Sequence, residues 1–308
     1  MQDGLLLIDK EAGGTSHDVV QRVRRILRQK KVGHCGTLDP DATGLLLLTL
    51  GSATRLTRFL IRAPKVYEGT LRLGVATDTY DATGRVVAEA PSGHLTTADV
   101  TAAMRGFEGT FEQQPPPYSA KKVGGVKYYE LARRGEEVPQ ETKEVTVFEF
   151  RPLGDLSDPA SEGVRSLRFL LACSSGTYAR SLAHDAGRAL GCGAHLAALR
   201  RTKIGPFEVA SALSLAALEE RVAAGDGPGS AWVSFDQIPL PFGEVTADPQ
   251  QEQRIHHGQT VLVRELGGEE GDWVRLVNRR RELIAVGTVV ERIGAGGVGI
   301  VQPKVVFR

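Results

Sequence analysis

The segment Lys31-Val-Gly-His-Cys-Gly-Thr-Leu-Asp-Pro-Asp-Ala-Thr-Gly44 surrounds Asp39 with residues that shape a loop. Its glycines permit backbone angles that other residues resist, and Pro40 moves Asp39 away from helical angles. The apolar run Leu45–Leu50 follows, which predicts a buried element that anchors the loop. A loop of fixed shape on a rigid support is a common place for a catalytic group. The alternative is an Asx-type turn in which Asp39 caps backbone N–H groups, and spacing alone favours neither.

A predicted helix with basic residues precedes this loop. Thr15 and Asp18 form a capping-box pattern, and apolar residues follow at helical spacing from residue 19 to residue 27. Arginines, including Arg22, lie between the apolar residues, and the basic run continues to Lys31. Such a run is usually a solvated helix face. Because this one leads into the Asp39 loop, contact of Arg22 and Lys31 with phosphates is an equal alternative.

Bulk composition excludes several classes of protein. A chain of 308 residues with 41% apolar and 24% charged residues is typical of a soluble globular protein, and its length predicts two domains. The net charge of +1 provides no global attraction for nucleic acid, so RNA binding would need local basic patches. The three cysteines are scattered and form no zinc pattern. Neither a signal peptide nor a membrane span is indicated, so we expect a cytoplasmic protein with reduced thiols.

Two further stretches carry aromatic and basic residues. Tyr67 lies on one face of a predicted strand, either as a core tyrosine or as a stacking platform for an extruded base. Residues 113–135 contain prolines, then glycines, with interleaved tyrosines and cations that include Lys121, Lys122 and Lys127. Such a mixture suits structured RNA, although an ordinary surface hairpin and helix would also fit it.

The motif Gly176-Thr-Tyr-Ala-Arg180 begins a predicted helix that ends near Gly191. A cation is unfavourable in the first turn of a helix, so Arg180 there suggests a specific anionic partner. We expect His184 and His195 to be surface or structural residues. Upstream, Thr77-Asp-Thr-Tyr-Asp-Ala-Thr-Gly84 is a polar loop in which Asp78 and Asp81 brace turns, and we assign them no chemistry.

These motifs resemble those of the TruB family of tRNA pseudouridine-55 synthases. The matching segments are Gly33 to Leu46, Gly51 to Arg55, Lys65-Val-Tyr67, the proline-rich insertion, Gly176 to Arg180 and Leu199-Arg-Arg201. Twelve residues with most positions specified are far more informative than a lone glycine fingerprint. Glu11 and Gly14 depart from the family pattern, but they affect only a turn.

The resemblance implies the roles of the site residues. Asp39 would be the catalytic aspartate and Arg180 its partner, while Tyr67, Tyr178 and Leu199 would bind the target uracil. His34 would help to turn the base out or fill the space it leaves, although a structural loop histidine is the alternative. Cys35 is expected to be tolerated and not nucleophilic. The expected RNA backbone contacts are Arg22, Lys31, Lys121, Lys122, Lys127, Arg200 and Arg201, with Lys203 as a further candidate.

The resemblance also implies the architecture. We expect an α+β fold with a mixed, mostly antiparallel sheet flanked by helices and a cleft across it. Residues 1–234 would form the catalytic domain, with a thumb-like insertion at about 113–140 that grips the tRNA arm. Short strands and tight turns predict that residues 235–308 form a small β module, which resembles a PUA-type RNA-binding domain.

The expected reaction needs no cofactor and no metal. Pseudouridine forms when the C1′–N1 bond breaks, the uracil turns and C5 joins C1′, with no redox change. Asp39 would attack C1′ or remove a proton at the sugar 2′ position, and the sequence leaves both routes open. The base must first leave its stack. Burial would raise the pKa of Asp39 and a nearby arginine would lower it, which makes the Asp39–Arg180 pair a mechanistic requirement.

The leading hypothesis is therefore a monomeric enzyme that isomerises uridine 55 in the T-loop of tRNA and recognises the T-arm stem-loop. A noncatalytic RNA chaperone that uses the same clamp is the rival from another class. Binding alone needs no buried carboxylate, which would repel phosphates, and Asp39 therefore favours the enzyme. A synthase directed by guide RNA is a second rival. The start of the chain lacks a basic extension, which favours action without a guide.

Overall fold

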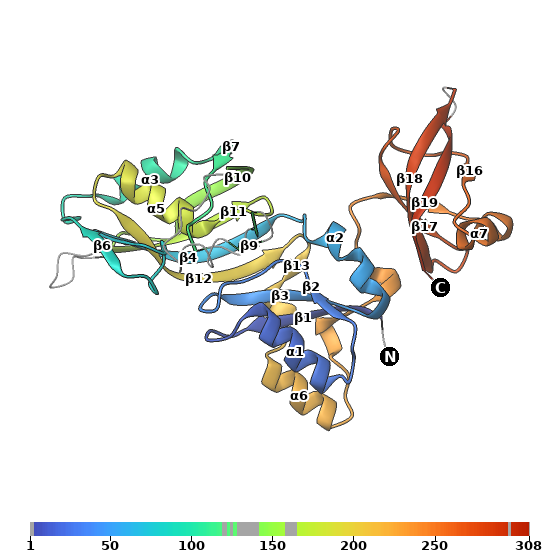
Figure 1. The fold of residues 1–308 in the computed structure, drawn as a ribbon, viewed down its shortest axis with the longest axis horizontal. Coiled ribbons are helices and arrows are strands. Elements are labelled where there is room, and N and C mark those ends of the chain that lie inside the picture. Colours follow the sequence, from blue (N-terminus) through green and yellow to red (C-terminus); the bar gives the residue numbers. More distant parts are fainter. Residues whose placement is uncertain are drawn as a thin grey trace.

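The computed structural model of the chain describes residues 3–118, 122–123, 126–127, 142–157, 165–294 and 297–307. Figure 1 shows a large sheet with helices and, at the C-terminal end, a smaller sheet. No helix among the described residues is both long enough and apolar enough to cross a membrane.

Ten strands of the described chain form the larger sheet. These are β1 (Gly4–Lys10), β2 (Val32–His34), β3 (Thr43–Leu50), β4 (Lys65–Leu73), β7 (Gly109–Gln113), β10 (Lys143–Pro152), β11 (Arg165–Cys173), β12 (Ala194–Ile204), β13 (Phe207–Glu208) and β14 (Trp232–Ser234). Their order is β14-β1-β3-β12-β4-β11-β10-β7, with β2 paired to β3 and β13 to β12. Strands β3 and β12 are paired in parallel, and the other pairs are antiparallel. The predicted mixed, mostly antiparallel sheet is thus confirmed.

Two pairs of described helices, α1 with α6 and α3 with α5, pack against the larger sheet. The α-helices are α1 (Ser16–Ile26), α2 (Thr57–Leu60), α3 (Thr97–Arg105), α5 (Ala179–Ala189), α6 (Leu215–Ala223) and α7 (Pro249–His256). Short 3₁₀ turns are η1 (Gly51–Leu56), η2 (Val209–Ser211), η3 (Gly229–Ala231) and η4 (Phe235–Gln237). In Figure 1, α1 and α6 lie side by side near β1 and β3, whereas α3 and α5 lie near the other end of the sheet. Helix α1 begins at the predicted capping box of Thr15 and Asp18.

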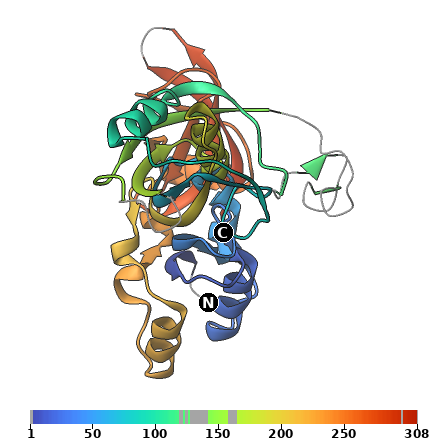
Figure 2. The ribbon, with the colours of Figure 1, turned by 90° about the vertical axis from the view of Figure 1, so that its left-hand side faces the viewer.

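Two small hairpins extend from this body. One pairs β5 (Val75–Thr77) with β6 (Val86–Glu89) and carries the polar loop between them. The other pairs β8 (Lys122–Val123) with β9 (Val126–Lys127), and Figure 2 shows it projecting away from the larger sheet.

The C-terminal sheet contains β15 (Gly243–Thr246), β16 (Val261–Val263), β17 (Trp273–Val277), β18 (Leu283–Ile293) and β19 (Val298–Val306). Its order is β15-β17-β18-β19-β16, and α7 contacts β16, β18 and β19. A small five-stranded module fits the predicted PUA-like unit. Together with the helix-flanked larger sheet, it confirms the α+β class.

The two sheets share an apolar core. Strand β3 supplies Leu45 to Leu48, which are fully buried, so the predicted anchor of the Asp39 loop is a central strand. Each buried leucine contributes about 2 kcal/mol of hydrophobic stabilisation. The same cluster includes Val286 and Phe307 of the C-terminal module. The module is therefore packed against the body that contains the larger sheet and is not merely tethered to it.

Candidate active site

The Asp39 loop connects β2 to β3 and is held on one side by a buried lysine. Lys10 is 1% exposed, and its Nζ donates to the carbonyl oxygens of Pro40 at 2.7 Å and Ala42 at 2.8 Å. A buried ammonium is costly unless its donors are satisfied, and these carbonyls satisfy them. Lys10 therefore fixes the backbone directly after Asp39. No motif in the sequence indicated that Lys10 belongs to the site.

A buried arginine holds the other side of the loop. Arg201 is 1% exposed and donates to the carbonyl oxygens of Leu45 at 2.8 Å, Gly36 at 3.1 Å and Thr37 at 3.4 Å. The prediction that Arg201 contacts RNA phosphates is wrong in this structure, because its guanidinium is directed inward. Gly44 permits the close packing: its φ is +99°, and a Cβ there would lie 2.2 Å from the Arg201 carbonyl oxygen.

The structure places Arg180 against Asp39. Its Nε lies 3.0 Å from Asp39 Oδ2, and its Nη2 donates to Asp39 Oδ1 at 3.2 Å. The Arg180 side chain is 8% exposed, whereas that of Asp39 is 46% exposed and faces the cleft. Among the hydrogen bonds of the described residues, Asp39 accepts with its side chain from Arg180 and not from a backbone N–H. The Asx-turn alternative is therefore not what the structure shows.

Arg180 is fixed by a second carboxylate. Its Nη1 donates to Asp81 Oδ2 and to the Thr79 carbonyl oxygen, both at 3.2 Å, and its Nη2 donates to the Tyr118 carbonyl oxygen at 3.1 Å. The guanidinium thus has an oxygen partner at every nitrogen, in the fork geometry that suits arginine. Asp81 does brace its loop, as expected, but its pairing with Arg180 was missed.

Although the Asp39 side chain is 46% exposed, the protein that surrounds it in the cleft dominates its electrostatics. Burial in the cleft raises the pKa of Asp39, and the Asp81 charge acts in the same direction. Arg180 and Lys10 oppose this shift but do not reverse it. Asp39 therefore takes up a proton more readily than a solvent-exposed aspartate.

Two adjoining cavities, of about 620 Å³ and about 540 Å³, meet at the ion pair, and Asp39, Arg180 and Leu199 line both. Tyr67 and Tyr178 line the smaller cavity. These volumes are in the range of small-molecule sites. The structure thus brings five of the predicted substrate-binding and catalytic side chains to one cleft. Burial raises the pKa of Tyr67, so its phenol is protonated at neutral pH.

His34 and Cys35, which precede Asp39 in the chain, line neither cavity. His34 is the last residue of β2, and its Nδ1 is buried without a hydrogen-bond partner in the described structure. Burial lowers the pKa of His34, which keeps the ring neutral. Cys35 is fully buried, and burial raises the pKa of its thiol to about 12, so the thiol is not a nucleophile.

Two other predicted phosphate contacts are ion-paired within the protein. Arg22 lies 2.5 Å from Glu219, and both side chains are about half exposed. Arg200 donates twice to Asp9, at 2.7 Å and 3.0 Å, and is 42% exposed. Both guanidinium groups remain accessible, since exposed ion pairs are weak and rearrange readily.

The insertion that would grip RNA is described only in part. Lys121 lies outside the described residues. Lys122 and Lys127 are directly opposite each other in the β8–β9 pair, which projects from the body (Figure 2).

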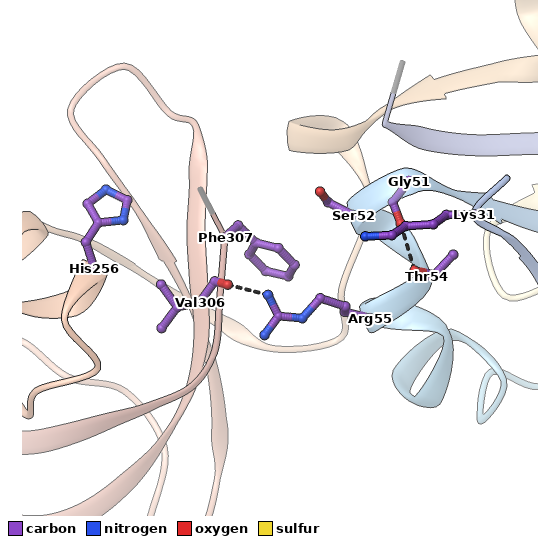
Figure 3. Close-up of a pocket in the computed structure, with 8 residues that line it drawn as sticks. All are labelled: Lys31, Gly51, Ser52, Thr54, Arg55, His256, Val306 and Phe307. Atoms are coloured by element: carbon purple, nitrogen blue, oxygen red, sulfur yellow. Dashed lines mark hydrogen bonds between the residues drawn. The ribbon is translucent and has the colours of Figure 1, made fainter. Parts of the chain in front are cut away.

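Lys31 lines a different cavity, of about 470 Å³, between η1 and the C-terminal module (Figure 3). Arg55 extends across it, donates to the Val306 carbonyl oxygen and packs on the Phe307 ring at 5.2 Å. His256 faces the same space from α7. Among the described residues, the lining of this cavity includes these three basic side chains and no Asp or Glu side chain.

Within the described ranges, no group of three or more His, Cys, Asp or Glu side chains is arranged to hold a metal ion. Where the two cavities meet, the cleft offers the Asp39 carboxylate, the buried Arg180 and the walls formed by Tyr67, Tyr178 and Leu199. Further charged residues also line the two cavities: Asp41, Asp81, Lys65, Lys143 and Arg201.

Comparison with known proteins identifies the family. Residues 24–179 match the N-terminal domain of TruB family pseudouridylate synthases, and residues 180–231 match the C-terminal domain of tRNA pseudouridylate synthase B. The chain belongs to the TruB family. It is 43% identical over 289 residues to tRNA pseudouridine synthase B of Solibacter usitatus, covering 94% of this chain and 96% of that one. It is 49% identical over 265 residues to the protein of that name from Thermobifida fusca, covering 85% and 87% of the two chains.

Solved structures show the same fold in this TruB-family chain. A chain of an H/ACA RNP bound to a substrate RNA that contains 2′-deoxyuridine is similar with a TM-score of 0.73 and 25% identity, over 99% of this chain and 85% of that one. A Cbf5-Nop10-Gar1 complex contains a chain similar at the same TM-score and 28% identity, with the same coverage.

Proposed function

We propose that this chain isomerises uridine 55 in the T-loop of tRNA to pseudouridine, and that Asp39 is the catalytic carboxylate. The observation that carries the proposal is the Asp39–Arg180 pair in a cleft lined by Tyr67 and Leu199. Its TruB-family membership and its relatives named tRNA pseudouridine synthase B support the same reaction.

The proposed reaction conserves all atoms of the base. The N1–C1′ bond breaks, the uracil turns, and C5 bonds to C1′; N1 then carries a proton, and the C5 proton leaves. Asp39 acts either at C1′ or on the 2′ proton, and both routes need its ionised form. Arg180 orients the carboxylate and opposes the burial that raises its pKa.

The cleft fits an extruded base. Tyr67 provides a flat, uncharged ring, Leu199 provides an aliphatic wall, and Tyr178 lies on the same cavity. Stacking on an aromatic ring contributes about 1–3 kcal/mol per base, which offsets part of the cost of taking the uridine out of its stack.

RNA backbone contacts are assigned to the accessible cations. Arg22 and Arg200 lie on the body that contains the larger sheet, and Lys122 and Lys127 lie on the projecting β8–β9 pair. Lys31 lies with Arg55 and His256 at the cavity beside the C-terminal module. A cavity with basic side chains and no carboxylate suits a phosphate. We further propose that the enzyme acts as a cytoplasmic monomer and recognises the T-arm stem-loop without a guide.

The test is tritium release from a T-arm hairpin that carries 5-tritiated uridine. The wild-type protein alone should release tritium, and the Asp39→Asn variant should keep its tRNA affinity but release none. Release by Asp39→Asn would overturn the assignment of Asp39. Failure of the wild type on the bare hairpin, with activity restored by added RNA or protein, would favour a guided enzyme. Binding without release under any condition would favour the chaperone.

A further inference from the structure

The turn that holds Arg180 has an unusual backbone at Tyr80. Its φ is +66°, in the left-handed region where a side chain with a Cβ is disfavoured. A non-glycine residue stays in this region only when its surroundings hold it there. We propose that the ring of His184, stacked on Tyr80, holds this turn and so positions Arg180 against Asp39. This inference rests on the proposed function of the Asp39–Arg180 pair.

Tyr80, the residue with positive φ, directs two oxygens toward Arg180. Thr79, just before Tyr80, presents its carbonyl oxygen to Arg180 Nη1, and Asp81, just after it, presents Oδ2 to the same nitrogen, both at 3.2 Å. With Tyr80 in an extended or helical conformation, the chain would turn differently and the two oxygens would no longer converge. Leu196 also holds the turn, since its N–H donates to the Tyr80 carbonyl oxygen at 3.0 Å.

Stacking of Tyr80 on His184 ties the turn to helix α5. The ring centroids are 3.8 Å apart and the planes differ by 13°, so the rings lie face on. His184 follows Arg180 by four residues on α5, which puts both side chains on one face of the helix. One helical turn therefore carries both the cation and the ring that fixes the oxygens around it.

The packing of His184 indicates that it acts through its ring face. Its Nδ1 is buried and has no hydrogen-bond partner in the described structure. Burial lowers its pKa, whereas Asp185 raises it and Arg188 lowers it, so the ring is neutral at neutral pH. A neutral imidazole against a phenol is a stacking partner, which any flat ring of similar size can replace.

The test compares His184→Ala, which removes the ring, with His184→Phe, which keeps one. His94→Ala is the matched control, because His94 is an exposed histidine between β6 and α3. In single-turnover assays on tRNA, we expect His184→Ala to be slower by about tenfold, since small misplacements of catalytic groups have large effects. His184→Phe should recover most of this loss, and tRNA affinity should not change in either variant.

A second readout reports on Asp39 itself. An NMR titration of the Asp39 carboxyl carbon should give a higher pKa in His184→Ala than in the wild type, because Arg180 is then less well placed to oppose burial. This measurement needs no activity. If the wild type makes no pseudouridine, the proposed function fails, and the titration still decides the positioning role.

Two substitutions of Tyr80 separate the effect of its ring from the effect of its strained backbone. Tyr80→Gly removes the ring but favours positive φ, while Tyr80→Ala removes the ring and keeps the strain. We expect Tyr80→Ala to be the slower of the two. The inference is overturned if His184→Ala keeps the wild-type rate and Asp39 titration, if His184→Phe is as slow as His184→Ala, or if the only effect of His184→Ala is a lower melting temperature.

Discussion

Arg180 contacts Asp39 with two nitrogens across 141 residues of chain, with Nε at 3.0 Å from Oδ2 and Nη2 donating to Oδ1 at 3.2 Å. The contact orients the carboxylate, because a fork meets both oxygens in one plane. It also favours the charged form of a group that burial disfavours. The orientation and the charge state of Asp39 therefore both depend on Arg180.

Replacing Arg180 should impair catalysis much more than binding. Arg180→Lys keeps a positive charge but cannot form the fork, so we expect turnover to fall about 100-fold with tRNA affinity nearly unchanged. Turnover under saturating tRNA and a filter-binding Kd measure the two effects. Arg188→Ala, on the exposed face of the same helix, is the control and should behave as the wild type. A loss of affinity without loss of turnover would contradict the role given to the ion pair.

The pH dependence of the rate should follow Asp39. Only the carboxylate is active, and its pKa is raised, so the single-turnover rate should fall as the pH is lowered, beginning at a higher pH than for a solvent-exposed aspartate. The charge of Asp81 contributes to this rise. Asp81→Asn, whose amide oxygen can still accept from Arg180, should therefore move the midpoint to lower pH. An upward shift would mean that Asp81 acts mainly by holding Arg180 in place.

The loop and its cation were predictable from local chemistry. The glycines and Pro40 indicate a shaped loop, Leu45 to Leu50 indicate its buried support, and Arg180 in a first helical turn indicates an anionic partner. The identity of that partner came from the family resemblance, because no local pattern links residues so far apart in the chain.

The sequence did not predict the roles of charged residues that are buried in the structure. A sequence gives the charge of Lys10 and Arg201 but not the layer that covers them. Strand β12 has register shifts between Leu196 and Ala198 and between Arg201 and Lys203, so simple alternation along it is interrupted. Arg200 and Arg201 are neighbours within an unshifted stretch and point to opposite faces, as neighbours on a strand do. Which of these faces is covered depends on the packed sheet. The role of Ser16 was also not predictable from the sequence. Its hydroxyl accepts from the Leu38 N–H at 2.9 Å, and this hydrogen bond joins α1 to the Asp39 loop.

Arg201 should matter for stability and not for RNA contact. Arg201→Met leaves three backbone carbonyls, two in the Asp39 loop and one at the start of β3, without their donor. We therefore expect a loss of about 3 kcal/mol in the free energy of unfolding. Arg200→Met breaks a half-exposed pair and should cost only about 0.5 kcal/mol. Urea unfolding compares the two variants. Equal stabilities would show that the guanidinium of Arg201 does not support the loop.

Lys31 should contribute to tRNA binding through charge alone. It is exposed at a cavity that Arg55 and His256 also line, and no Asp or Glu is found in the described part of the lining. If Lys31 contacts a phosphate, Lys31→Ala should weaken binding and reduce the slope of log K against log salt by about 1, because one fewer counterion is released. Arg151→Ala is the control, since Arg151 on β10 lines neither the Lys31 cavity nor the two active-site cavities. The single-turnover rate at saturating protein should not change, because Lys31 does not line either active-site cavity. An unchanged salt slope would place the RNA elsewhere on the molecule.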